Sequence, residues 1–185
     1  AVRTGRRYHA EEPDARSTVH RAAREGSTQL NCTDGVKSMP GNAPDMETLA
    51  TVARKHGELL YVDEALGFGV TGERAADETS PYGSRGDSLV RHVGETYHDF
   101  GLVCGFAKSY SSLQAFIALP TWLKDHLKVA AAPYLCSGPS PVASLATVLA
   151  GFDVNDSRGD DIRASLYRKT AQVLKTASEL GLATP

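Results

Sequence analysis

The chain has 185 residues, which is enough for one domain with a sizeable hydrophobic core and too few for two large domains. A hydrophobic fraction of 41% and a charged fraction of 23% match an average globular protein, and they exclude collagen-like, mucin-like and wholly disordered chains. The 20 Lys and Arg residues nearly balance the 22 Asp and Glu residues, so the net charge is −2. Because this charge attracts neither nucleic acid nor an anionic membrane, and because no apolar run is long enough to span a bilayer, we expect no nucleic-acid partner and no membrane.

The cysteines and histidines favour neither a disulfide framework nor a metal site. Cys32, Cys104 and Cys136 are odd in number, widely spaced and without a C-x-x-C pair. We expect free thiols in a reducing cytoplasm, each packed as a small buried hydrophobic residue. The six histidines include no pair with metal-ligand spacing such as H-x-x-x-H. The sequence therefore predicts a cytoplasmic protein without a metal centre.

The first half of the chain reads as strands that alternate with helices. A short helix is expected at residues 17–24 and a short strand at 29–33. Apolar residues then recur at helical spacing within residues 44–57, where a proline suits the first turn and a glycine the end. Residues 58–62 (ELLYV) form a compact apolar run that stops abruptly at Asp63. This run predicts a buried strand of a parallel sheet.

The second half continues the pattern after a glycine-rich loop. Gly67, Gly69 and Gly72 make an isolated G-x-G-x-x-G match, from which we expect a loop and no dinucleotide site. The polar residues 73–87 predict a surface loop. The elements expected beyond it are a helix at 88–97, strands at 101–106 and 116–119, and helices at 121–129, 141–152 and 160–181. The helix at 141–152 is apolar nearly all round, which predicts burial. The fold class expected from this alternation is α/β, with a mostly parallel sheet flanked by helices.

Two residues with useful chemistry follow predicted strands. Asp63 ends the strand at 58–62, and Lys108 comes shortly after the strand at 101–106. Ligands of open α/β sheets bind at the carboxyl ends of the strands. An amine there can form a Schiff base with an aldehyde, and an acid can hold a pyridine nitrogen protonated, which together would serve pyridoxal 5'-phosphate. By spacing alone, a turn or cap role for Asp63 and a solvated Lys108 remain open.

Several motifs resemble those of the α-oxoamine synthases, which belong to the class II pyridoxal-phosphate aminotransferase superfamily. Residues 34–41 (DGVKSMPG) and 62–72 (VDEALGFGVTG) are similar to two blocks of that family. Lys108 sits where the family has its Schiff-base lysine, and residues 133–141 (PYLCSGPSP) resemble a later family segment. The resemblance extends from about Tyr8 to Gly181.

This resemblance implies a fold, a reaction and a set of site residues. The fold is part of the large domain of the fold type I pyridoxal-phosphate-dependent transferase fold, with a core at about 18–152 and a helix at 160–181 that leads to a small domain absent from this chain. The reaction is condensation of an amino acid with an acyl thioester of CoA or a carrier protein. The implied residues are Asp63 as pyridinium partner, Lys108 as Schiff-base and proton-transfer residue, Ser38 near the ring or its phenolic oxygen, Ala65 in the cofactor pocket, and Ser137 reaching the phosphate of a neighbouring subunit's cofactor.

The sequence also departs from the family pattern. Leu66 replaces a histidine, Gly105 replaces a threonine that holds the phosphate, and residues 113–115 replace a glycine pair. Each loss removes a polar contact to a charged cofactor, worth about 1–3 kcal/mol. Two alternatives therefore stay open beside the acyltransferase: a non-catalytic subunit or scaffold of the same fold, and an aminotransferase or amino-acid lyase.

Members of the family are much longer than this chain. The chain is thus expected to be a fragment, one part of a split enzyme, or a degenerate relative. An incomplete sheet exposes edges and apolar surface unless something covers them. We therefore expect a homodimer or an obligate partner chain.

Overall fold

The computed structural model describes residues 30–78 and 80–184. Its elements, in chain order, are β1 (Leu30–Asp34), α2 (Met46–His56), β2 (Leu59–Asp63), α3 (Leu89–His92), the 3-10 turn η1 (Tyr97–Asp99), β3 (Phe100–Gly105), β4 (Ala115–Ala118), α4 (Thr121–Ala130), α5 (Ala132–Leu135) and α6 (Val142–Glu179). The four expected strands are confirmed to within a residue or two. The helix expected at 17–24 lies outside the described residues.

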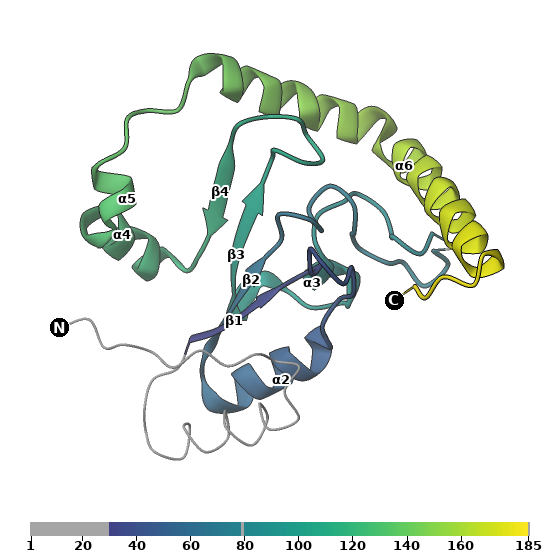
Figure 1. Cartoon of the computed structure of the whole chain (residues 1–185). Coiled ribbons are helices and arrows are strands. Elements are labelled where there is room, and N and C mark those ends of the chain that lie inside the picture. Colours follow the sequence, from purple (N-terminus) through teal and green to yellow (C-terminus); the bar gives the residue numbers. More distant parts are fainter. Residues whose placement is uncertain (1–29, 79, 185) are drawn as a thin grey trace.

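The described strands form one four-stranded sheet in the order β1-β2-β3-β4. β1 pairs with β2 and β2 with β3 in parallel, whereas β4 runs antiparallel to β3 at the edge. α2 makes the crossover from β1 to β2 and packs against β2. Figure 1 shows the sheet with α2 on one side and α6 arching past the opposite end. The expected α/β architecture with a mostly parallel sheet is confirmed.

Local signals set the ends of α2. The Asp45 side chain accepts a hydrogen bond from the Thr48 backbone N–H at 3.1 Å, which satisfies a donor that the first turn leaves free. Gly57 closes the helix with φ +64°, a conformation that glycine adopts without strain. Between these ends, Met46, Ala50 and Ala53 recur at helical spacing and are buried. The helix is therefore amphipathic, and its apolar stripe covers the sheet.

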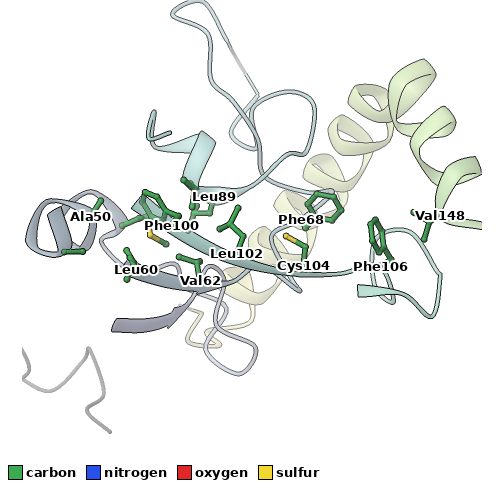
Figure 2. Close-up of a cluster of buried hydrophobic side chains, with 13 residues drawn as sticks. Ala50, Leu60, Val62, Phe68, Leu89, Phe100, Leu102, Cys104, Phe106 and Val148 are labelled. Atoms are coloured by element: carbon green, nitrogen blue, oxygen red, sulfur yellow. The ribbon is translucent and has the colours of Figure 1, made fainter. Parts of the chain in front are cut away.

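The hydrophobic core lies on one face of the sheet. Leu60 and Val62 of β2 pair in register with Phe100 and Leu102 of β3, so the four side chains share a face. Figure 2 shows this core running from Ala50 of α2 across the sheet to Phe106 and Val148. On β2 the alternate residues Tyr61 and Asp63 are half-buried on the other face. Asp63 thus lies away from the apolar core, on the more open face.

Three expected helices differ from the structure. The segments at 141–152 and 160–181 form one continuous helix, α6, of 38 residues. The helix expected at 88–97 stops at His92, because the chain reverses at Gly94 with φ +79°.

Three predictions of burial are wrong. The first turns of α6 are not buried: Val142 is 81% and Leu149 66% exposed. Cys104 is buried as expected, whereas Cys32 and Cys136 are exposed. All three thiols are free. Within the described residues, no helix is both long and apolar enough to cross a bilayer.

Candidate functional site

The carboxyl ends of β1, β2 and β3 meet at one edge of the sheet, because the three strands run parallel (Figure 1). Ser38 lies exposed in the loop after β1, Asp63 is the last residue of β2, and Lys108 follows β3 by three residues. The Gly35 N–H donates to the Asp63 carbonyl at 2.8 Å, so the loop after β1 is bonded to the end of β2. The structure therefore brings the segments of Ser38, Asp63, Ala65 and Lys108 to a common edge.

Ser137 lies elsewhere. It sits on the exposed connection between α5 and α6, beyond β4 in Figure 1. Its hydroxyl donates to the Tyr134 carbonyl at 3.2 Å. Within this chain Ser137 is not joined to the edge that carries Asp63 and Lys108.

The Asp63 carboxylate is held by its own loop. Its Oδ1 accepts a hydrogen bond from the Ala65 backbone N–H at 2.9 Å. The Glu64 N–H donates to the Val103 carbonyl at 2.7 Å, so the pairing with β3 continues past the end of β2. These two bonds fix the direction of the Asp63 side chain before any ligand binds.

Gly105 leaves space beside Ala65. A Cβ placed at Gly105 would meet the Ala65 Cβ at 3.6 Å, an ordinary van der Waals contact. The backbone at Gly105 is not in the left-handed region. The glycine is therefore not required by packing, and the site would accommodate a small side chain at this position.

Lys108 lies exposed in a tight loop between β3 and β4. The Phe106 N–H donates to the Gln114 carbonyl at 2.8 Å, and the Ser112 N–H donates to the Phe106 carbonyl at 3.0 Å. The Ser112 hydroxyl in turn donates to the Ser144 carbonyl of α6 at 3.0 Å. The lysine is thus presented at the surface by a loop that is anchored on both the sheet and α6.

Sequence reasoning missed Glu64, which lies under this edge. It is fully buried, and its Oε1 accepts from the Leu89 backbone N–H at 3.0 Å. Gly35 and Gly67 both lack room for a Cβ, because the Glu64 carboxyl occupies that space. Burial raises the pKa of Glu64 to about 7, against the lowering effect of the backbone donors of Leu89 and Val90. The two glycines around a strand-end acid are the signal that could have found it.

Arg163 of α6 was also missed. Its side chain is 4% exposed and donates to the Gly69 carbonyl at 3.2 Å and to Asn155 Oδ1 at 2.7 Å. It also pairs with Asp160, and that hydrogen bond lowers the pKa of the Asp160 carboxyl. Arg163 therefore joins α6 to the loop that follows Asp63. Its position in a polar stretch of a predicted helix carries no signal for this contact.

The described residues contain no group of three or more His, Cys, Asp or Glu side chains arranged to hold a metal ion. What the edge offers instead is a carboxylate at the end of β2 and a primary amine in the loop after β3. A carboxylate and an amine can bind one polar heterocycle from two sides.

Comparison with known proteins assigns the chain to a family. The model of the family described as aminotransferase class I and II matches residues 7–184. The chain therefore belongs to the aminotransferase class I and II family.

Within that family, the resemblance to α-oxoamine synthases is confirmed by the relatives. An 8-amino-7-oxononanoate synthase of Chromohalobacter salexigens is 32% identical over 179 residues, which are 97% of this chain and 43% of that protein. One of Alkalilimnicola ehrlichii is 35% identical over 146 residues, or 77% of this chain and 34% of that protein. The chain thus spans less than half the length of these curated relatives.

Solved structures show the same fold. A serine palmitoyltransferase of Sphingomonas wittichii matches with a TM-score of 0.71 and 24% identity, over 84% of this chain and 36% of that chain. The 8-amino-7-oxononanoate synthase of Francisella tularensis matches with a TM-score of 0.66 and 20% identity, over 97% of this chain and 48% of that chain. The expected fold type I transferase architecture is confirmed.

Proposed function

We propose that this chain forms part of a pyridoxal 5'-phosphate-dependent transferase that condenses an amino acid with an acyl thioester of CoA or a carrier protein. The observation that carries the proposal is the parallel pairing of β2 with β3, which delivers Asp63 and the loop of Lys108 to one edge of the sheet. The family membership and the named relatives support the reaction type.

The residues at this edge suit the cofactor. Asp63 has one carboxylate oxygen held by Ala65, so its direction is set and its charge can hold a proton on a pyridine nitrogen. Lys108 presents its amine in solvent, where it can bind the cofactor's aldehyde carbon and move a proton at the substrate's α-carbon. When bound, pyridoxal phosphate would supply an electron sink for a carbanion at that carbon. Ala65 would pack on the ring, and Ser38 would approach it from the loop after β1.

The remaining parts of the proposal concern the whole protein. The chain would be part of the large domain, with a core at about 18–152 and α6 leading toward a small domain. Its active assembly would be a homodimer or a complex with an obligate partner chain, in which Ser137 reaches the phosphate at a neighbouring subunit's site. The exposed position of Ser137 supports this role, since the residue is not tied to its own chain's site. We propose a cytoplasmic location, in keeping with three free thiols.

A non-catalytic scaffold of the same fold is the second candidate. Leu66 and Gly105 favour it, because neither side chain can make a polar contact with a charged cofactor. An aminotransferase or amino-acid lyase would use the same edge of the sheet. It would differ in needing no acyl thioester.

The decisive experiment adds pyridoxal phosphate to the full chain, together with any partner that co-purifies with it. We expect a visible absorption band, and borohydride reduction should attach the cofactor covalently to the peptide that contains Lys108. The test variant is Lys108→Ala. Its matched control is Lys124→Ala, which removes an exposed lysine of α4. Only the first variant should lose the attachment.

Turnover then separates the candidate reactions. Condensation requires the acyl thioester, whereas transamination requires an oxo acid in its place. A preparation that stays colourless with excess cofactor and partner contradicts the proposal. Full turnover by Lys108→Ala in the assembly would favour the scaffold.

A further inference from the structure

One aromatic residue joins the two halves of the proposed site. Phe68 lies in the loop after Asp63 and is 7% exposed. Its ring meets Phe106 edge-on with centroids 5.5 Å apart and stacks on Tyr110 with centroids 5.4 Å apart. Phe106 and Tyr110 stand two residues before and two residues after Lys108. Figure 2 shows Phe68 and Phe106 together at the end of the core. The lysine loop is thus held on both sides of Lys108 by the same ring.

A hydrogen bond reinforces this contact directly beside the lysine. The Ser109 hydroxyl donates to the Phe68 carbonyl at 2.7 Å, a well-formed bond between segments that are 41 residues apart in sequence. The two loops approach so closely that only glycine fits at position 69. A Cβ there would come within 2.5 Å of Ser109 Oγ and 2.6 Å of Ser109 Cβ, and φ at Gly69 is +82°.

The hydroxyls of Ser109 and Ser112, near Lys108, therefore bond to different segments. The Ser112 side chain binds the Ser144 carbonyl and accepts from Thr147 Oγ1, so it faces α6. The Ser109 side chain faces the loop that begins at Asp63. Because Lys108 itself is exposed, its place relative to Asp63 depends on these anchors and not on packing of its own side chain.

We propose that Ser109 is a positioning residue, whose bond to the Phe68 carbonyl sets the spacing between the Lys108 amine and the Asp63 carboxylate. The inference rests on the function proposed above. It adds a residue that touches neither cofactor nor substrate and acts through the loop it fastens.

The test compares Ser109→Ala and Ser109→Thr with a control variant at another serine. Ser157→Ala is the control, because the Ser157 hydroxyl also donates to a backbone carbonyl at 2.7 Å but within α6. The readouts are the rate at which bound pyridoxal phosphate exchanges with an excess of a phosphorylated pyridoxine analogue, and the thermal midpoint of the cofactor-free protein. Loss of this one partly buried hydrogen bond should make exchange about tenfold faster in Ser109→Ala. Ser109→Thr keeps the hydroxyl and should restore the wild-type rate, and Ser157→Ala should leave it unchanged.

Each result decides one question. If the wild type takes up no cofactor, the proposed function fails. If the wild type binds the cofactor and Ser109→Ala exchanges it at the wild-type rate, this inference alone is overturned. Equally fast exchange in Ser109→Ala and Ser109→Thr also overturns it, since the hydroxyl would then not be the determinant. A thermal midpoint that falls equally in Ser109→Ala and Ser157→Ala, with no difference in exchange, would assign Ser109 a purely structural role.

Discussion

Two adjacent carboxyl groups at the end of β2 have opposite surroundings. Asp63 is half-buried on the open face, whereas Glu64 is fully buried among Gly35, Gly67 and the start of α3. Strand periodicity was enough to place Asp63 at the sheet edge. It could not single out Glu64, because that side chain becomes buried only when the loop of Gly35 and the start of α3, both distant in sequence, close over it together with its own loop.

The burial of Glu64 predicts a pH dependence of stability. Desolvation raises its pKa from 4.5 in the unfolded chain to about 7 in the folded one, with Asp63 and Asp87 adding to the shift. Between these values the folded state keeps a proton that the unfolded state has lost. The free energy of unfolding should therefore fall as pH rises through this window, by up to about 3 kcal/mol from this group.

Glu64→Gln removes the titration and keeps an acceptor for the Leu89 N–H. Urea unfolding of both proteins at about pH 5 and about pH 8 measures the effect. We expect the free energy of unfolding to fall much less between these pH values in the variant than in the wild type. An identical fall in both proteins would show that other groups cause it.

The long helix α6 is the element that sequence reasoning divided in two. Gly151 and Gly159 lie within this helix, and both are packing positions. A Cβ at Gly151 would meet Tyr110 at 2.5 Å, and a Cβ at Gly159 would meet Asn155 Oδ1 at 2.6 Å and Arg163 at 2.8 Å. Helix propensity cannot distinguish a glycine that ends a helix from one that admits a neighbour, so tertiary contact overrides it here.

The contacts of Arg163 should contribute to the stability of the packing between α6 and the loop after Asp63. Arg163→Met keeps much of the apolar stem but leaves the Gly69 carbonyl and Asn155 without their donor. We expect the free energy of unfolding to fall by about 2 kcal/mol. The control is Arg168→Met on an exposed turn of the same helix, for which we expect a change within about 0.5 kcal/mol. Equal losses in the two variants, measured by urea unfolding, would refute the fastening role.

In the described part of the chain, large apolar side chains lie exposed on α4, α5 and the first half of α6, which stand around β4 in Figure 1. We refer to these side chains together as the apolar surface. Its members include Trp122, Val129, Tyr134, Leu135, Val142, Leu145 and Leu149. A surface of this kind on a soluble monomer promotes association. It therefore supports the proposed dimer or partner chain.

This surface predicts the behaviour of the chain in isolation. We expect the purified chain to self-associate in sedimentation velocity. The double variant Val142→Lys with Leu149→Lys should shift it toward the monomer, with an unchanged circular dichroism spectrum. Ser157→Lys with Gln172→Lys adds the same charge at exposed polar positions of α6 and should have little effect. A wild-type chain that sediments as a stable monomer would contradict the expectation.

The strands, α2 and the family were readable along the chain, because each depends on neighbouring residues. Apolar periodicity makes the α2 stripe, an apolar run makes β2, and local motifs carry the resemblance. The same alternation places Asp63 and Lys108 after parallel strands.

Burial and the anchoring of loops depend on residues that meet only after folding. The closed pocket of Glu64, the continuity of α6 through two glycines, the reach of Arg163 to Gly69 and the bond from Ser109 to Phe68 all join distant segments. The free energy of such contacts depends on both of the segments that meet, so the residue pattern of one segment does not predict it.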